Sequence, residues 1–137
     1  MISARPGTIV TVERVINKAS HATVAETVAR LIAEVEACGM KLFTTIDHGA
    51  EPGATGLERR ETKLVVFDNP RTGTLIMQAA PVAGLDLPLK VLVRADPGRR
   101  CVSSAAPAEL VARYQLSDEL AAGLAGIDPL TDAAIVR

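Results

Sequence analysis

Residues 43–93 read FTTIDHGAEPGATGLERRETKLVVFDNPRTGTLIMQAAPVAGLDLPLKVLV, and this stretch decides the fold. Apolar runs alternate in it with segments rich in Gly, Pro and polar residues, a pattern typical of strands joined by loops. The predicted strands cover Lys41–Ile46, Lys63–Phe67 and Leu89–Ala95. We expect the rest of the chain to support this middle segment.

The middle segment also predicts a helix. Asn69 is a good N-cap and Pro70 suits the first helical position, so a helix should begin there and end before Pro81. Its inward side should carry Leu75, Ile76, Ala79 and Ala80. The run Lys63–Phe67 is apolar without alternation, which indicates a central strand covered by helices on at least one face.

The flanks supply further elements. Thr8–Val12 predicts the first strand, and Thr23 with Glu26 fits a capping box for a helix that ends at Gly39, with Cys38 as a small core residue. Asp96-Pro97-Gly98 predicts a turn to an antiparallel strand at residues 100–104. Later helices should start at Pro107, after Ser117 and at Asp128.

These elements predict a single α+β domain over residues 8–137, with residues 1–7 as a short lead-in. The expected architecture is a mainly antiparallel sheet with helices packed on one face. For residues 49–60, which contain three glycines and a proline, we expect a loop with at most one helical turn.

The composition argues against several classes of function. Fifteen basic and sixteen acidic residues give a net charge of −1, and only three aromatic residues occur, so nucleic acid is a poor partner. No apolar run approaches the roughly 20 residues that cross a bilayer, and the N-terminus lacks the features of a signal peptide. We therefore expect a soluble, cytoplasmic protein without membrane contact. Cys38 and Cys101 should be reduced thiols.

His48 is the best candidate for chemistry, because it follows a predicted strand and a neutral imidazole can act as a base near pH 7. Asp47 is its neighbour, but successive side chains of an extended segment point to opposite faces, so no Asp–His pair is implied. A histidine hydrogen-bonded at a strand end is the structural alternative.

The helix start at Asn69 is the second candidate. It offers free backbone amides and a partial positive charge, and the guanidinium group of Arg71 can bind a carboxylate or phosphate through two hydrogen bonds. Gln78 could reach the same place as His48. Asp86 lies in a loop between apolar residues and could cap local amides or pair with Arg71 or Lys90. A purely structural role stays open for each of these residues.

Metal and cofactor sites are not predicted. His21 and the two cysteines lack partners at ligand spacing, and no P-loop, GxSxG, HExxH or dinucleotide-binding pattern occurs.

The middle segment resembles a bacterial and archaeal family known as domain of unknown function 302. The resemblance covers roughly residues 8–126 and rests on 46–48, the strand at 63–67, 69–71, 73–74, 77–79 and 84–90. It implies a small α+β domain with the architecture of TATA-binding protein, without that protein's DNA binding, and a homodimer. It implies no established reaction.

This chain departs from the family pattern at three points. Ser104-Ala105-Ala106 replaces a Tyr-Asn-Asp run, so Ala106 cannot cap the helix at Pro107 with its side chain. Asp68 stands where a glycine is usual, and the loop at 49–56 replaces an alanine-rich piece. An activity shared by the family could therefore be lost or altered here.

Three functions remain open from the sequence. The first is a binding module that holds a small polar or anionic ligand in a cleft lined by His48, Arg71 and Gln78, with Asn69 and Asp86 nearby. The second is an enzyme that uses His48 as a general acid or base, tuned by Asp47 or Asp86. The third is an interaction protein that acts through its dimer surface.

Overall fold

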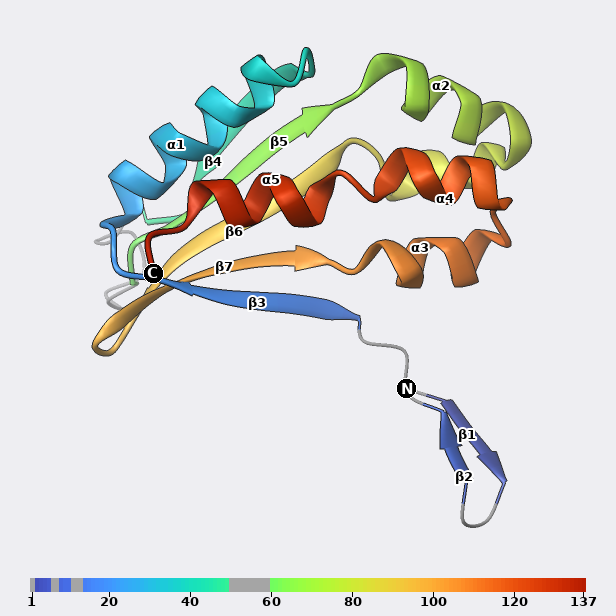
Figure 1. Cartoon of the computed structure of the whole chain (residues 1–137), viewed down its shortest axis with the longest axis horizontal. Coiled ribbons are helices and arrows are strands. Elements are labelled where there is room, and N and C mark those ends of the chain that lie inside the picture. The colour runs from blue at the N-terminus through green and yellow to red at the C-terminus, as the bar shows by residue number, and fades with distance from the viewer. Residues whose placement is uncertain (1, 6–7, 11–13, 50–59) are drawn as a thin grey trace.

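The computed structural model describes residues 2–5, 8–10, 14–49 and 60–137. A five-stranded antiparallel sheet has the strand order β3-β7-β6-β5-β4 (Figure 1). Its strands are β3 (Val15–Ser20), β4 (Lys41–Asp47), β5 (Thr62–Asp68), β6 (Leu89–Asp96) and β7 (Arg99–Ala105). A separate antiparallel pair is formed by β1 (Ile2–Arg5) and β2 (Thr8–Val10).

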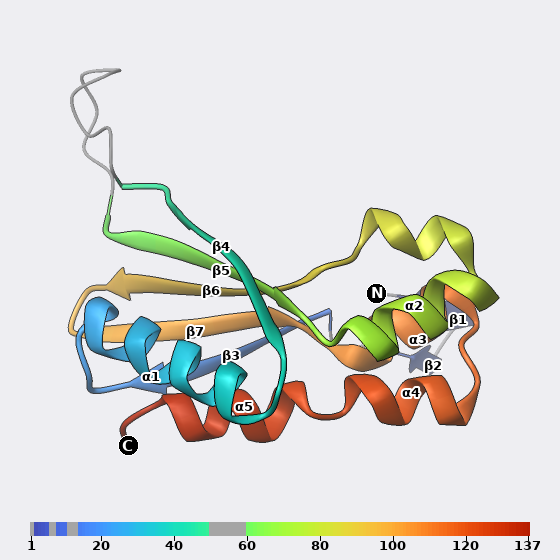
Figure 2. The ribbon, with the colours of Figure 1, turned by 90° about the horizontal axis from the view of Figure 1, so that it is seen from above.

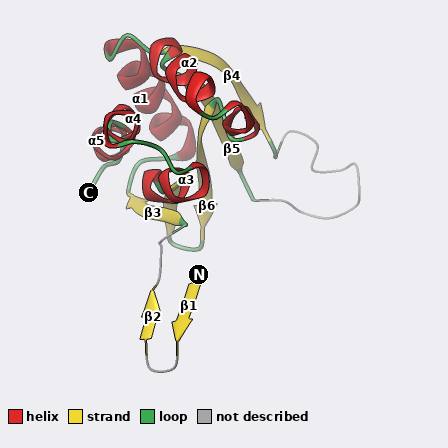
Figure 3. Cartoon of the chain, turned by 90° about the vertical axis from the view of Figure 1, so that its right-hand side faces the viewer, coloured by secondary structure: helices red, strands yellow, loops and turns green. Residues whose placement is uncertain are grey.

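Helices cover one face of this sheet and one of its ends. Figure 2 shows α1 (Val24–Ala37) and α5 (Ile127–Ala134) on the same side of the strands. At the end where β5 and β7 finish, Figures 1 and 3 show α2 (Pro70–Ala79), α3 (Pro107–Tyr114) and α4 (Asp118–Leu124), and the 3₁₀ helix η1 (Pro81–Leu85) follows α2. The predicted α+β class, an antiparallel sheet with helices on one face, is confirmed.

The core lies between the sheet and α1. Val65 of β5 pairs with Val91 of β6, and both are fully buried, as is Phe67. Leu31 and Val35 on α1 are also fully buried in the same cluster. Burying a Val, Leu or Phe side chain contributes about 1.5–3 kcal/mol each, so this cluster anchors the central strands.

Local signals placed α1 and the β6–β7 hairpin correctly. The side chain of Thr23 accepts a hydrogen bond from the amide of Glu26 at 3.1 Å, and Gly39 has φ +74°. The turn between β6 and β7 contains Gly98 at φ +78°, as the Pro-Gly pattern predicts. Cys38 was expected in the core but is exposed, because it is the C-cap residue beyond the last buried position of the helix.

The strand predicted at Thr8–Val12 is described only over Thr8–Val10, and this part does not belong to the five-stranded sheet. Residues 8–10 pair with β1 outside the five-stranded sheet, and the strand that precedes α1 is β3. The segment VINKAS lacks a clear apolar face, because Lys18 occupies a position on the helix-covered side. Its ammonium group lies 2.7 Å from Asp128 and 2.9 Å from Asp132 on α5, which satisfies the charge there.

The predicted helix start at Asn69 is confirmed, since its side-chain oxygen accepts from the amides of Arg71 and Thr72 at 3.1 and 3.3 Å. The predicted inward face is only partly right: Ile76 is buried, whereas Leu75 is 42% exposed. Ala79 is also exposed and Ala80 is half-buried. The helix stands beyond the end of the sheet, so a narrow stripe suffices to pack it.

The last three helices begin close to the predicted residues. Ala106 precedes α3 without a side-chain cap, as expected, while Ser117 caps α4 by accepting from the amide of Leu120 at 3.3 Å. The last helix starts one residue before Asp128. The domain boundary at residue 8 stays a prediction, and residues 50–59 of the expected loop lie outside the described residues.

Asp68, the family departure at the end of β5, fits against a glycine of α2. It is buried, and its carboxylate accepts from the amide of Asn69 at 2.9 Å. Burial raises the pKa of this carboxyl group, opposed by the Asn69 amide and by Lys90. A Cβ added to Gly73 would lie only 2.6 Å from the second carboxylate oxygen.

We predict that Gly73→Ala destabilises the protein by about 1–3 kcal/mol, because the buried carboxylate must move. In an Asp68→Ala background the same change should be neutral, or stabilising by up to about 1 kcal/mol through helix propensity. Urea unfolding of the two single variants and the double variant measures this coupling. An equal loss in both backgrounds would refute the proposed contact.

Candidate functional site

The strand register separates the predicted site residues. His48 follows β4, and its amide donates to the carbonyl of Thr62 at the start of β5, with a distance of 2.9 Å. Asn69 and Arg71 follow the other end of β5. That strand has seven residues, which corresponds to about 20 Å at the usual rise. The expected cleft lined by both His48 and Arg71 is therefore not formed.

The other predicted residues do not gather around His48 either. Asp47 closes its own turn by accepting from the amide of Gly49 at 2.9 Å. Arg71 and Gln78 are exposed on α2, and the side-chain oxygen of Asn69 is occupied by amides of its own helix. Of the predicted residues, Asp86 lines a pocket of substantial volume.

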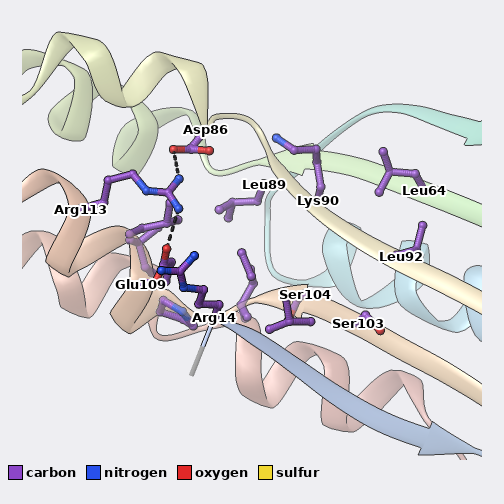
Figure 4. A pocket seen from close by; sticks show the side chains of 16 residues that line it. Arg14, Leu64, Asp86, Leu89, Lys90, Leu92, Ser103, Ser104, Glu109 and Arg113 are labelled. Atoms are coloured by element: carbon purple, nitrogen blue, oxygen red, sulfur yellow. Dashed lines mark hydrogen bonds and ion pairs between the residues drawn. The ribbon is translucent and has the colours of Figure 1, made fainter. Parts of the chain in front are cut away.

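This pocket lies where β6 and β7 diverge. Their ladder ends at Val91 and Ser104, whereas β6 stays paired with β5 as far as Leu89. A pocket of about 570 Å³ occupies the opening beside α3 (Figure 4). Its volume is within the roughly 300–1,000 Å³ typical of small-molecule sites. Core residues reach it from the helix-covered side: Leu89, Leu110, Leu124 and Ile127.

Charged residues alternate along one rim of the pocket. Asp86 accepts from the guanidinium of Arg113 at 2.7 Å and from the hydroxyl of Tyr114. Arg113 also donates to Glu109 at 2.6 Å (Figure 4). Arg14, just before β3, lines the same pocket. The carboxylate of Asp86 thus ties the segment before β6 to the last turn of α3.

This network fixes its own protonation states. The hydroxyl of Tyr114 holds the pKa of the Asp86 carboxyl below its usual range; partial burial opposes this shift, and Arg113 and Lys90 add to it. Asp86 in turn raises the pKa of Tyr114 and that of Arg113. At neutral pH Asp86 is therefore an anion, Tyr114 a hydrogen-bond donor and Arg113 a cation.

Ser104 is one of two buried polar residues, with Ser103, that line the pocket. It is 7% exposed and lines the pocket, and its hydroxyl makes no hydrogen bond with any described residue. Among the described residues, every side-chain oxygen or nitrogen that is closed off from solvent has a hydrogen-bond partner. The hydroxyl of Ser104 has no such partner, so it is open to the pocket. By contrast, the hydroxyl of Ser103 donates to Asn17. Ser104 can thus donate to, or accept from, a bound molecule.

Comparison with known proteins identifies the family. Residues 16–134 match the family described as "Domain of unknown function DUF302". The chain belongs to this family. A crystal structure of an uncharacterized conserved DUF302 protein from Bacillus stearothermophilus has the same fold, with a TM-score of 0.76 over 90% of this chain and 97% of that chain, at 18% sequence identity.

Curated relatives of this DUF302 chain are longer proteins. It is 40% identical over 98 residues to "Fluoride-specific ion channel FluC 1" of Brucella suis biovar 1 (strain 1330) and to the protein of the same name from Brucella abortus biovar 1 (strain 9-941). The match covers 71% of this chain but only 39% and 36% of those relatives. Within the described part of this chain, no helix is both long and apolar enough to cross a membrane.

Sequence reasoning found Asp86 in this DUF302 chain but missed its partners. Arg71 and Lys90 were the expected partners, and the structure pairs Asp86 instead with Arg113 and Tyr114. The spacing of Glu109 and Arg113, four residues apart on a predicted helix, was the available signal. Nothing local marked Ser104, because its role depends on where two strands diverge. Within the described ranges, no cluster of three potential metal ligands occurs.

We predict that Asp86→Asn lowers the free energy of unfolding near neutral pH. The pKa of Asp86 is depressed in the folded state, so its stabilisation is present above the unfolded value of about 3.9 and is lost as the pH falls through the folded value. The difference between wild type and variant should shrink between about pH 5 and pH 2.

Urea unfolding across this pH range measures the effect. Glu36→Gln is the matched control, because Glu36 is exposed on α1 and makes no ion pair with a described residue. If the difference in the free energy of unfolding between wild type and Asp86→Asn does not change with pH, the assigned contact is contradicted.

Proposed function

We propose that this DUF302 chain is a binding module for a small polar or anionic ligand held in the pocket between β6 and β7. The hydroxyl of Ser104, which lines the pocket and makes no hydrogen bond with a described residue, is the observation that carries the proposal. Because this hydroxyl is open to the pocket, it is available to donate a hydrogen bond to a bound molecule or to accept one from it. Arg14, Lys90 and Arg113 add positive charge at the rim.

Of the residues selected from the sequence, this proposal keeps Asp86 in a ligand site. Its role is to position Arg113 and α3 beside the pocket, since its carboxylate is already engaged by two donors. An anion at Arg113 would compete with Asp86, so Lys90 and Arg14 are the better contacts for a negatively charged group. His48, Asn69, Arg71 and Gln78 have no part in this site.

Two alternatives remain for the chain. For an enzyme that uses His48 as acid or base, Asp47 and Asp86 were the carboxylates expected to tune the ring, but Asp86 lies at the other end of the sheet and Asp47 accepts from the amide of Gly49. A homodimer has better support, because the face of the sheet opposite α1 and α5 carries exposed apolar residues. Val15, which pairs with Ala105, is 50% exposed there, and Ile46, which pairs with Leu64, is 42% exposed.

The name of the Brucella relatives makes fluoride a candidate ligand as well. A pocket of about 570 Å³ with an apolar floor is far larger than a halide ion needs, so an organic ligand suits it better. Fluoride belongs in a ligand screen as a test of the connection that the shared sequence suggests.

We predict that binding of small molecules, measured by backbone amide NMR, shifts resonances of β6, β7 and α3 and not those near His48. Ser104→Val fills the head of the pocket and removes its hydroxyl, so it should weaken such binding at least about tenfold, or 1.4 kcal/mol. Thr44→Val on β4 is the control for an added apolar group in a strand.

Retained spectral dispersion of Ser104→Val would show that the variant is folded; if it is not, Lys90→Ala on the exposed rim serves in its place. Hits that shift only residues around His48 or α2, or that bind Ser104→Val as tightly as wild type, would contradict the proposed site.

For the dimer, we predict a sedimentation coefficient that rises with protein concentration and a loss of this dependence in Ile46→Lys. Leu75→Lys is a matched control, because Leu75 is equally exposed, at 42%, but lies on α2 away from the open sheet face. A wild-type protein that sediments as a monomer at all concentrations would exclude the dimer.

A further inference from the structure

The outer wall of the pocket is apolar and comes from three strands. Leu64 of β5 pairs with Leu92 of β6, and both project to the face of the sheet opposite α1. Val15 of β3 lies on the same face and is half exposed. The side chains of Leu64 and Leu92 are half-buried at the pocket (Figure 4). An apolar group placed there would remove this surface from water.

The charges around the pocket leave a positive surplus. Arg113 is already held by Asp86 and Glu109. Arg14 and Lys90 also line the pocket, and neither makes an ion pair with a described residue. The ammonium group of Lys90 donates to the carbonyl of Pro88 at 2.8 Å, which leaves two of its three protons for other acceptors.

The same rim argues against a highly charged ligand. Asp86 and Glu109 are carboxylates that would repel a second or third negative charge placed beside Arg113. Lys90 and Arg14 are not neutralised by an ion pair with a described residue, so the rim can attract one negative charge. The pocket also exceeds what a simple anion occupies, since a cavity of about 150 Å³ already takes a benzene molecule.

We infer that the ligand is an amphiphilic monoanion: a carboxylate, or a group of the same charge, attached to an apolar body. The anionic end contacts Lys90 and Arg14, and the apolar body lies against Leu64, Leu92 and Val15. The hydroxyl of Ser104 hydrogen-bonds a polar atom at the inner end. This inference rests on the proposed function and adds the chemical class of the ligand.

Three probes separate the two parts of the ligand: octanoate, octanol and acetate. Octanoate has the charge and the apolar chain, octanol has the chain alone, and acetate has the charge alone. Titrations followed by amide NMR should show octanoate binding at the pocket at least about tenfold more tightly than either of the others.

Two variants test the contacts. Lys90→Met keeps the length of the side chain and removes its charge, so it should lower octanoate affinity about tenfold and leave octanol unchanged. Leu92→Ser should weaken both. Lys63→Met is the charge control, because Lys63 pairs with Val93 and so faces the opposite side of the sheet from Lys90.

The outcomes distinguish the inference from the proposed function. Octanol or acetate binding as tightly as octanoate, or unchanged octanoate affinity in Lys90→Met, would overturn the amphiphilic anion. A neutral polar molecule that binds the pocket while octanoate does not would overturn it as well and leave the proposed function standing. If the chain binds neither octanoate nor any other small molecule in the pocket, both the inference and the proposed function are contradicted.

Discussion

The divergence of β6 from β7 is the constraint on which the site depends. The two strands form a continuous ladder from their turn to Val91 and Ser104, and beyond that point β6 follows β5 while β7 leads into α3. Strands that separate leave backbone and side chains that must be covered in another way. The helical end of the molecule, with α3 and α4, does this only in part, and the pocket is what remains.

Asp86 holds the two sides of that opening together. Its carboxylate accepts from two neighbouring residues of α3, Arg113 and Tyr114, and so fixes the segment that enters β6 relative to the helix that follows β7. Charge-assisted hydrogen bonds of this kind are stronger than neutral ones, and two on one carboxylate restrict its orientation. The separation of the strands is therefore held in place by side chains.

Much of the fold could be predicted because the deciding signals are local. The cap at Thr23, the Asn69-Pro70 helix start and the Pro-Gly turn before β7 each depend on residues close in sequence. The strand β3 was not predicted because Lys18 interrupts the apolar pattern of its inward face. The ammonium group of Lys18 pairs with aspartates more than a hundred residues further along the chain. No local pattern could reveal that pairing.

The site was harder to predict for the same reason. The predicted cleft required His48 and Arg71 to lie close together. The register of β4 and β5 instead puts these two residues at opposite ends of β5. Asp86 was found because an acid between apolar residues is conspicuous. Its partners lie 27 and 28 residues further along the chain, and that contact is set by the packing of α3.

The most direct test of the account locates a bound molecule in the pocket. With methyl-labelled leucine and valine, nuclear Overhauser effects from octanoate should appear at the methyl groups of Leu64, Leu92 and Val15. Effects confined to the methyl groups of residues distant from the pocket, such as Leu75 and Val82, or none at saturating octanoate, would contradict it.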